Sequence, residues 1–416
     1  MPQRSSPLDL SRSLASADPA FARRRFLLLA GLFGVSALTA TSCRRLPFAE
    51  PSDPGVRVGY LPITDSAPLL AAIDKGFFRE EGLEVAAPQQ YKSWDAIAQA
   101  FMTREVNVIH VLMPTAMWMR YGANFPGKII AWNHTNGSAL TVSPEIDRLE
   151  DLSGQTIAVP SWLSIHNIVV QMMLDRAGLE PVLHAGSAAI GDRQVGLKVM
   201  PPPDMLAALR DRTIAGYIVA EPFNAAAESQ RVGKLLRLTG DVWQDHACCV
   251  VFVHQDDIDR RPDWTQAVAN AIVRSQQWSN HNRRELAYLL SKDGSQYTPF
   301  SVDVLGRVLT TYDTDFYHQR GVLHHPEWRA SRIDFQPYPF TSYTHQLARE
   351  LQRTLVGSFG QADSSDSLDF LRQISPAHVA TDLVDDSFVR QALRLVGGPQ
   401  AFGLSADLDR SELVEI

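Results

Sequence analysis

The stretch VRVGYLPITDSAPLLAAIDKGFF, Val56 to Phe78, has the pattern of a buried strand that ends in a polar turn and continues as an amphipathic helix. The turn Thr64-Asp65-Ser66 supplies side chains that can cap the helix, because Asp and Ser accept hydrogen bonds from its free N–H groups. Open α/β sheets bind small ligands where a strand leads into a helix in this way. The stretch predicts an α/β fold with a binding site, but no catalytic machinery, at this turn.

The same strand-to-helix pattern returns along the chain. It returns at Met113-Pro114-Thr115, at 161–164, at 200–204 and at Glu221-Pro222-Phe223-Asn224. Two α/β units in a chain of this length predict two lobes with a binding cleft between them, which close on a ligand by hinge motion. We assign residues 56–143 and 239–340 to lobe 1, residues 144–238 to lobe 2, and residues 341–416 to a helical C-terminal extension.

Residues 1–43 have the pattern of an export signal. Arg23-Arg24-Arg25-Phe26-Leu27 begins an apolar run that ends at Ala40 and is too short to span a bilayer comfortably. The RR-x-F-L spacing is typical of a twin-arginine signal, which exports a folded protein, and an ordinary secretory signal or a signal anchor is the alternative. We therefore expect the protein to work outside the cytoplasm.

Cys43, which follows Ala40-Thr41-Ser42, resembles the lipid-modified cysteine of bacterial lipoproteins, although a large apolar residue is usual three places before that cysteine. A lipid at Cys43 would hold the protein on the outer face of the cytoplasmic membrane, with residues 44–55 as a tether. No later apolar run reaches the length of a transmembrane helix.

Composition and charge exclude several classes of function. The formal net charge is −7, and it falls to −10 without residues 1–42, which carry five arginines and two aspartates, so a nucleic-acid partner is not expected. Besides Cys43 only the adjacent Cys248 and Cys249 occur, so we expect two small buried side chains and no ordinary disulfide. Four histidines have no compact ligand spacing, and we predict no metal site and no cofactor. They are His318, His324, His325 and His345.

Several stretches together resemble one family. They are GYLPITDSAPLLAAIDKGFFREEGLEV (59–85), DLSGQTIAVP (151–160), PSWLSIHN (160–167), MPPPDMLAAL (200–209), AEPFNAAAE (220–228) and DVWQDH (241–246). They are similar to periplasmic binding proteins of ABC importers in the nitrate, bicarbonate and taurine class, above all to nitrate- and bicarbonate-binding lipoproteins. The resemblance covers about residues 56–290. It implies the two-lobed class II binding-protein fold, a monomer, and delivery of a small molecule to a membrane permease with an ATPase.

The resemblance also implies which residues contact the ligand. The oxyanion binders of this family use a tryptophan, a glutamine, a histidine and a lysine in the cleft. Trp94 and His166 match the tryptophan and the histidine, whereas Ser138 stands at the glutamine position and Cys248-Cys249 at the lysine position. Without the lysine, specific binding of nitrate or bicarbonate is not expected, because a buried anion needs a partner charge or several donors. These replacements predict a roomier, less polar pocket.

We therefore predict a small organic ligand, either pyrimidine-like or vitamin-like or a sulfonate, with a simple oxyanion as the alternative. The predicted ligand-binding residues are Thr64, Asp65, Ser66, Trp94, Pro114, Thr115, Ser138, Ser161, Trp162, His166, Glu221, Cys248 and Cys249. Aromatic side chains near the cleft turns are candidates to stack on a planar ligand, and about half of them should instead pack in the core. These aromatic residues are Trp94, Trp118, Trp162, Phe223 and Trp243.

Two other classes of function stay open. The fold also resembles that of pyrimidine synthases of thiamine biosynthesis, in which a histidine and a cysteine-rich loop act, but an export signal argues against that chemistry. No G-x-S-x-G, H-E-x-x-H, G-x-G-x-x-G or P-loop motif supports an enzyme. A sensor that binds the same ligand is the third possibility, and adjacent permease and ATPase genes would favour the importer.

Overall fold

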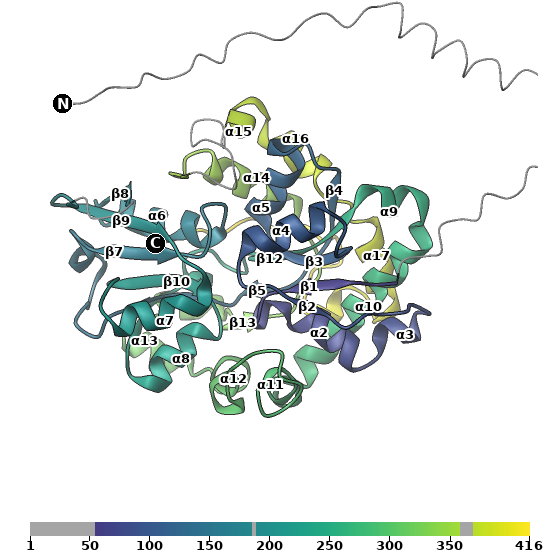
Figure 1. The fold of residues 1–416 in the computed structure, drawn as a ribbon, viewed down its shortest axis with the longest axis horizontal. Helices are drawn as coiled ribbons and strands as arrows, with labels where there is room; N and C mark the ends of the chain where they lie inside the picture. The colour runs from purple at the N-terminus through teal and green to yellow at the C-terminus, as the bar shows by residue number, and fades with distance from the viewer. Residues whose placement is uncertain (1–54, 185–188, 358–368) are drawn as a thin grey trace, which may run out of the picture. The chain divides into compact units, whose positions relative to one another are not determined.

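The computed structural model describes residues 55–184, 189–357 and 369–416 (Figure 1). The predicted signal at residues 1–43, Cys43 and the tether up to residue 54 lie outside the described residues. Among the residues that are described, no helix is long and apolar enough to cross a membrane.

The first sheet forms the centre of lobe 1. Its strands are β1 (Val58–Tyr60), β2 (Gln89–Gln90), β3 (Val108–Leu112), β4 (Gly127–Trp132) and β12 (Cys249–His254). Their order is β2-β1-β3-β12-β4, with β1 parallel to β2 and β3 and with β12 antiparallel to β3 and β4. The helices of this lobe are α2 (Ala67–Asp74), α3 (Phe77–Glu80), α4 (Trp94–Met102), α5 (Met113–Met117), the π-helical η2 (Trp118–Gly122), α9 (Gln255–Arg260) and α10 (Pro262–His281).

The second sheet forms the centre of lobe 2. Its strands are β6 (Ser138–Val142), β7 (Thr156–Val159), β8 (Glu180–Leu183), β9 (Gln194–Val199), β10 (Gly216–Ala220) and β11 (Lys234–Leu238). Their order is β11-β6-β10-β7-β9-β8, and β6 is antiparallel to both of its neighbours. The helices here are η3 (Leu149–Leu152), α6 (Ile165–Arg176), α7 (Pro202–Arg210), α8 (Phe223–Gln230) and η4 (Thr239–Asp241).

The chain passes between the two sheets twice, which gives the two-lobed α/β fold expected from the sequence. It leaves the first sheet after β4, forms β5 (Thr135–Asn136), and enters the second sheet at β6; it returns between β11 and β12. The predicted lobe boundary at residue 143 is wrong, because β6 pairs with β10 and β11 in the second sheet. The crossing therefore lies before Ser138.

The quoted stretch forms the predicted strand, turn and helix, as β1, the 3₁₀ turn η1 (Thr64–Ser66) and α2. The capping detail differs from the prediction. Ser66 occupies the N-cap position of α2, but its side chain accepts no bond from the helix, and its hydroxyl donates to the Ile63 carbonyl at 2.7 Å. Gly76, with φ of +79°, adopts the left-handed conformation between the end of α2 and the start of α3.

Residues 283–340 bridge both lobes instead of belonging to lobe 1. The elements of this segment are α11 (Arg283–Leu290), α12 (Val302–Leu309), α13 (Thr314–Gln319), η5 (Pro326–Trp328) and β13 (Ile333–Asp334). In Figure 1, α11 and α12 lie below the two lobes, and their apolar side chains share one cluster with Leu70 of α2 and Ala225 of α8. Tyr317 of α13 packs with Leu235 and Leu238 of lobe 2.

The C-terminal extension packs against lobe 1 as part of the main core. It contains α14 (Thr341–Leu351), α15 (Asp369–Gln373), α16 (Pro376–Asp382), α17 (Ser387–Leu395) and η6 (Pro399–Phe402). Helix α17 packs along α10, and α14 packs against α16. Tyr343 of α14 is buried against Trp132 and Trp243, and its hydroxyl donates to the carbonyl of Ala247, next to the cysteine pair. The extension therefore supports one side of the lobe junction.

Candidate functional site

The polar turns that follow the strands of one lobe contact those of the other. The backbone N–H of Thr64 in η1 donates to the carbonyl of Glu221 at 2.9 Å, and the Thr64 hydroxyl donates to the same oxygen at 3.0 Å. A second pair lies beside it, where the hydroxyl of Thr115, next to Pro114 in the first turn of α5, donates to the Leu163 carbonyl at 2.8 Å. These contacts bring the two lobes together at the predicted strand ends.

Four ionisable side chains meet at this junction and are completely buried. They are Asp65, His134, Cys248 and Cys249, and their ligand atoms all lie within 4.8 Å of one another. His134 Nε2 lies 2.9 Å from Asp65 Oδ2, and Cys249 Sγ lies 3.5 Å from the same oxygen. The two sulfur atoms are 3.9 Å apart, so both cysteines are free thiols. We call these four residues the junction cluster.

Lobe 2 contributes Ser138 and His166 next to the junction cluster. His166 lies in the first turn of α6, which Ser164 caps by accepting a bond from the Asn167 N–H at 3.0 Å. Its Nε2 lies 2.9 Å from the Ser138 hydroxyl and 3.9 Å from Cys248 Sγ. The positions that the resemblance assigned to the glutamine, the histidine and the lysine are therefore in contact with one another.

Burial and the neighbouring charges shift the pKa values in the cluster. Burial lowers the pKa of His134, but Asp65 and then Cys248 more than offset this and raise it to about 10. Burial raises the pKa of Asp65 to about 6 in spite of His134. Burial also raises the pKa of Cys248, yet the hydrogen bond with Cys249 and the nearby His166 lower it overall to well below its usual value. A protonated His134 at neutral pH follows from its raised pKa, and Cys248 is the more acidic of the two thiols, because the pKa of Cys249 is raised.

More histidine rings stand within electrostatic reach of Cys248. Burial lowers the pKa of His110 to about 3 and that of His246 to about 4, so both are neutral acceptors or donors at pH 7. His110 Nε2 accepts the N–H of Leu61 at 3.0 Å, and His246 Nε2 lies 2.9 Å from the Thr239 hydroxyl. The sequence-based expectation of a less polar pocket is wrong, because these rings and the cluster make the surroundings polar.

Several buried polar atoms around the cluster have no hydrogen-bond partner among the described residues. They are Asp65 Oδ1, Trp94 Nε1, His110 Nδ1, His134 Nδ1, His166 Nδ1 and His246 Nδ1. Buried polar atoms are nearly always paired, because an unpaired one loses its hydration without compensation. Their concentration at a junction between two lobes indicates the place where a bound molecule or ion would supply the missing partners.

The other predicted site residues support the turns around the cluster. Trp94 is buried in lobe 1, with its ring centre 5.5 Å from that of His110. Ser161 Oγ accepts the Leu163 N–H at 3.2 Å, and the carbonyl of the half-buried Trp162 accepts from the Asn167 side chain at 2.9 Å. Trp94 therefore packs against His110 on the lobe 1 side of the junction, and Ser161 and Trp162 hold the turn that leads into α6.

Glu221 turns its carboxylate away from the junction cluster. Its Oε1 accepts from the buried Arg332, 2.8 Å from Nε, and its Oε2 accepts the Ala225 N–H at 3.1 Å. Only its backbone carbonyl reaches the lobe junction. Two of the predicted stacking residues also pack elsewhere, since Phe223 contacts Phe300 and the Trp243 indole donates to Glu412 at 2.8 Å.

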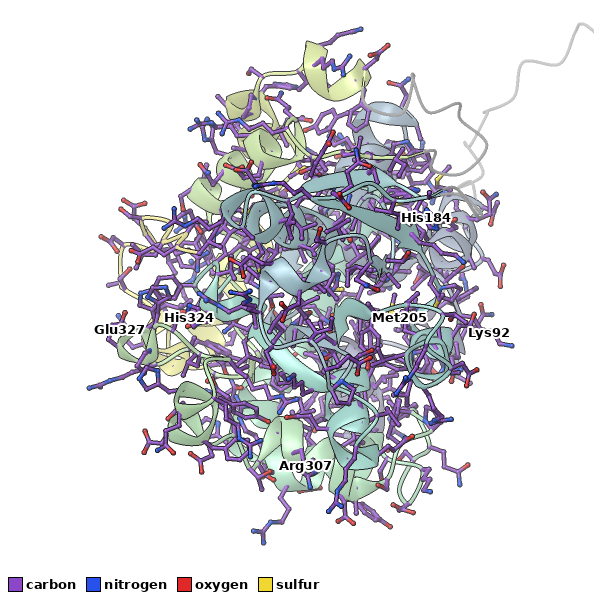
Figure 2. The ribbon with its side chains drawn as sticks, turned by 90° about the vertical axis from the view of Figure 1, so that its left-hand side faces the viewer. Lys92, His184, Met205, Arg307, His324 and Glu327 are labelled. Carbon is purple, nitrogen blue, oxygen red and sulfur yellow. The ribbon has the colours of Figure 1, made fainter. Side chains whose placement is uncertain are left out.

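Sequence reasoning missed His134, the partner of Asp65. It lies two residues after the end of β4, and a polar loop after a buried strand is the same signal that selected Asp65, so the pattern contained it. The histidine-rich region 318–345 forms no comparable cluster: His324 Nε2 lies 3.0 Å from the Gly321 carbonyl, and His325 stacks on Trp328. In Figure 2, His324 lies with Glu327 at one edge of the molecule, on the side of the view opposite Lys92.

The comparison with known families covers more than half of the chain, since residues 49–291 match the model of the NMT1-like family. This chain belongs to the NMT1-like family. Among curated relatives of this NMT1-like protein, the nitrate/nitrite binding protein NrtA of Nostoc sp. is 26% identical over 368 residues, which are 77% of this chain and 80% of NrtA. The nitrate import ATP-binding protein NrtC of Synechocystis sp. is 28% identical over 266 residues. The matched part is 62% of this chain and 40% of NrtC.

The solved structures confirm the fold of this NMT1-like protein. The periplasmic nitrate-binding protein NrtA from Synechocystis matches with a TM-score of 0.63 and 17% identity, covering 84% of this chain and 91% of NrtA. The resemblance to nitrate- and bicarbonate-binding proteins is therefore confirmed at the level of family and fold. The relatives named here are binding and transport proteins by their descriptions.

Proposed function

We propose that this protein is the solute-binding component of an ABC importer and delivers a small molecule to a membrane permease coupled to an ATPase. One observation carries the proposal: Asp65 of lobe 1 and His166 of lobe 2 converge on one buried junction, each with a polar atom that has no partner among the described residues. Two lobes that meet around unpaired polar groups suit capture of a solute by closure. The relation to NrtA and NrtC supports the transport role.

We also propose that the solute is a neutral, nitrogen-containing organic molecule, such as a pyrimidine-like or vitamin-like ring. Asp65 and the low-pKa thiol of Cys248 would repel nitrate, bicarbonate or a sulfonate. His134, the cation of the junction cluster, is already paired with Asp65. A ring N–H or amino group could instead donate to Asp65 Oδ1, and a ring nitrogen or carbonyl could accept from His166.

Native mass spectrometry of the protein purified from an exporting host tests this function. We expect a mass increment of a few hundred daltons that is lost on denaturation, and identification of the released molecule then names the solute. Calorimetric titration with nitrate and with bicarbonate is the counter-test. Tight binding of either anion would overturn the organic solute and leave the transport role in place.

Export and anchoring are the second part of the proposal. The pattern of residues 23–43 supports export and a lipid at Cys43, which would keep the protein at the outer face of the membrane as a monomer. Labelling of growing cells with a radioactive fatty acid should mark the wild-type protein, and Cys43→Ser should release an unlabelled protein from the membrane. An unlabelled wild-type protein would contradict the anchor.

A further inference from the structure

We propose that Asp65, His134, Cys248 and Cys249 form a binding site for one transition-metal ion of the thiolate-preferring class, with Zn²⁺ as its representative. The proposal goes beyond solute binding. When the ion is bound, these four side chains hold it and Ser138 and His166 face the solute; when the ion is absent, Asp65 Oδ1 stays available to the solute. All four residues are fully buried, and their ligand atoms lie within 4.8 Å of one another.

The distances between the sulfur and oxygen atoms match the edges of a tetrahedral site. Zn–S bonds of about 2.3 Å and Zn–O bonds of about 2.1 Å give edges of roughly 3.8 Å between two sulfurs and roughly 3.6 Å between sulfur and oxygen. The observed distances are 3.9 Å from Cys248 Sγ to Cys249 Sγ and 3.5 Å from Cys249 Sγ to Asp65 Oδ2. Both edges are therefore close to those of a metal site before any side chain moves.

The edge between His134 and Asp65 is shorter, as a hydrogen bond requires. His134 Nε2 and Asp65 Oδ2 are 2.9 Å apart, whereas a tetrahedral site needs roughly 3.4 Å between nitrogen and oxygen. Binding of the ion would replace the proton between these atoms and widen the edge by about half an ångström, a small side-chain rotation. The protons of His134 and of the thiols would pass to solvent, and no oxidation or reduction occurs.

The donor set selects the class of ion. Two sulfurs, one imidazole nitrogen and one carboxylate oxygen suit Zn²⁺ and similar ions, whereas Ca²⁺ and Mg²⁺ require oxygen ligands throughout. The donors also come from a fixed framework. Cys249 begins β12 and pairs with Leu112, His134 lies in the crossing between β4 and β5, and Asp65 lies in η1.

A second observation, independent of the distances, points to a cation. Asp65 Oδ1 is buried and has no hydrogen-bond partner in the part of the chain that the structure describes. A buried carboxylate beside two thiols is costly unless a cation balances it. The single proton on His134 balances one charge, whereas a divalent ion would balance two and hold the carboxylate directly.

The test uses cobalt as a spectroscopic probe of thiolate coordination. Untagged protein from the exporting host, kept reduced and freed of metal by a chelator, is titrated with Co²⁺ alone. We expect one equivalent to bind, with a sulfur-to-cobalt charge-transfer band in the near ultraviolet and intense visible bands typical of tetrahedral cobalt. Zn²⁺ should then displace the cobalt and remove both signals.

Single substitutions decide whether these four residues hold the ion. Cys248→Ser and Cys249→Ser should each weaken Co²⁺ binding more than about 100-fold and reduce the charge-transfer band. His378→Ala, which changes an exposed histidine of α16, should change neither. Circular dichroism identifies any variant that fails to fold, and Asp65→Asn supplies a second, isosteric variant in that case. Co²⁺ spectra without a charge-transfer band, or unchanged by both cysteine substitutions, would overturn the proposal.

The same samples separate this proposal from the proposed function. If solute binds to chelator-treated protein that shows no cobalt spectrum, the metal site fails and solute binding stands. If cobalt binds through the cysteines and no solute is found by native mass spectrometry, the metal site stands and the organic solute fails.

Discussion

Two ionic groups of this molecule each pair a fully buried carboxylate with a basic side chain, but they differ in how completely their atoms are paired. In lobe 2, the guanidinium of Arg332 contacts Glu221, Glu228 and Tyr317, with 2.7 Å from Nη1 to the Tyr317 hydroxyl and 3.2 Å from Nη2 to Glu228. We call these four residues the Arg332 network. At the lobe junction, the cluster around Asp65 leaves one carboxylate oxygen and a ring nitrogen of His134 without partners among the described residues.

The difference separates a structural role from a binding role. In the Arg332 network the charges satisfy one another, so removal of one member leaves the others buried and uncompensated. In the junction cluster the missing partners correspond to a bound solute or ion, so removal of one member costs binding more than folding. The following predictions test this contrast from the largest expected effect to the smallest.

Breaking the Arg332 network should cause the largest loss of stability. Arg332→Ala leaves the fully buried carboxylate of Glu221 without its cation, and we expect the free energy of unfolding to fall by about 3–5 kcal/mol. Urea unfolding followed by circular dichroism measures this change. The double variant Arg332→Ala, Glu221→Gln should recover part of it, and a loss under about 1 kcal/mol for the single variant would show that the network is not structural.

Changing the junction cluster should affect binding instead. Asp65→Asn keeps the volume and removes the charge that His134 pairs with. Because His134 can then release its proton, as Arg332 cannot, the free energy of unfolding should fall by only about 1–2 kcal/mol, while solute affinity should fall more than about tenfold. Asp74→Asn at the exposed end of α2 is the matched control and should alter neither quantity. A large stability loss with unchanged affinity in Asp65→Asn would reverse the contrast.

The comparison also explains how far the sequence could lead. Strand-to-helix signals are local, so Asp65 could be named from the sequence pattern. Ser138, His166 and the cysteine pair are named from the family resemblance instead, and the structure brings all of them together. The partner of Glu221 could not be named in this way. Arg332 lies 111 residues further along the chain, in a segment whose path across lobe 2 has no local signature.

The misplaced lobe boundary has a similar cause. The buried run Ser138–Val142 indicates a strand, but periodicity does not say which sheet the strand joins. That choice depends on the crossing at Asn136 and Gly137, which both adopt positive φ values and turn the chain from β4 toward the second sheet. A crossing of this kind is defined by its long-range pairing with β13, where Ile333 pairs with Asn136.

The pH dependence of stability should carry the signature of the junction cluster. The pKa of His134 is about 10 in the folded protein and about 6.5 in the unfolded chain. Its contribution to the free energy of unfolding is therefore complete below pH 6.5 and is lost as pH rises toward 10. The lowered pKa of Cys248 acts in the opposite direction up to about pH 8.5, the value of a free thiol. The interval from about pH 8.5 to 10 therefore isolates His134 from Cys248.

Between about pH 8.5 and pH 10, the free energy of unfolding should fall by about 1–2 kcal/mol more for the wild type than for His134→Gln. Urea unfolding at these two pH values measures the change. In the folded protein no group of the Arg332 network changes charge in this interval. Glu221 and Glu228 more than offset burial and raise the pKa of the Arg332 guanidinium, and burial raises the pKa of Tyr317 above its usual value. In Arg332→Ala the free energy of unfolding should therefore change with pH as steeply as in the wild type. If the free energy of unfolding changed with pH in the same way for the wild type and His134→Gln, His134 would be neutral in the folded protein.

The smallest effect is expected at a third, outer ionic group, which joins the C-terminal extension to lobe 1. Asp382 of α16 accepts from Arg120 at 2.5 and 2.8 Å, and hydrogen bonding from Arg120 and Tyr121 lowers the pKa of Asp382 well below its usual range. A lowered carboxyl pKa stabilises the folded state above about pH 3.9, and this contribution is lost as pH falls below that value.

Because the Asp382 side chain is 27% exposed, water and salt screen the pair, and we expect Asp382→Asn to lose only about 1 kcal/mol at pH 7. As pH falls from about 5 to 3, the free energy of unfolding of the wild type should approach that of Asp382→Asn. Molar salt should reduce the difference in unfolding free energy between these two proteins at pH 7. The stability loss of Arg332→Ala should persist in salt, because that network is buried. An Asp382→Asn loss as large and as salt-resistant as that of Arg332→Ala would mean that exposure does not separate these groups.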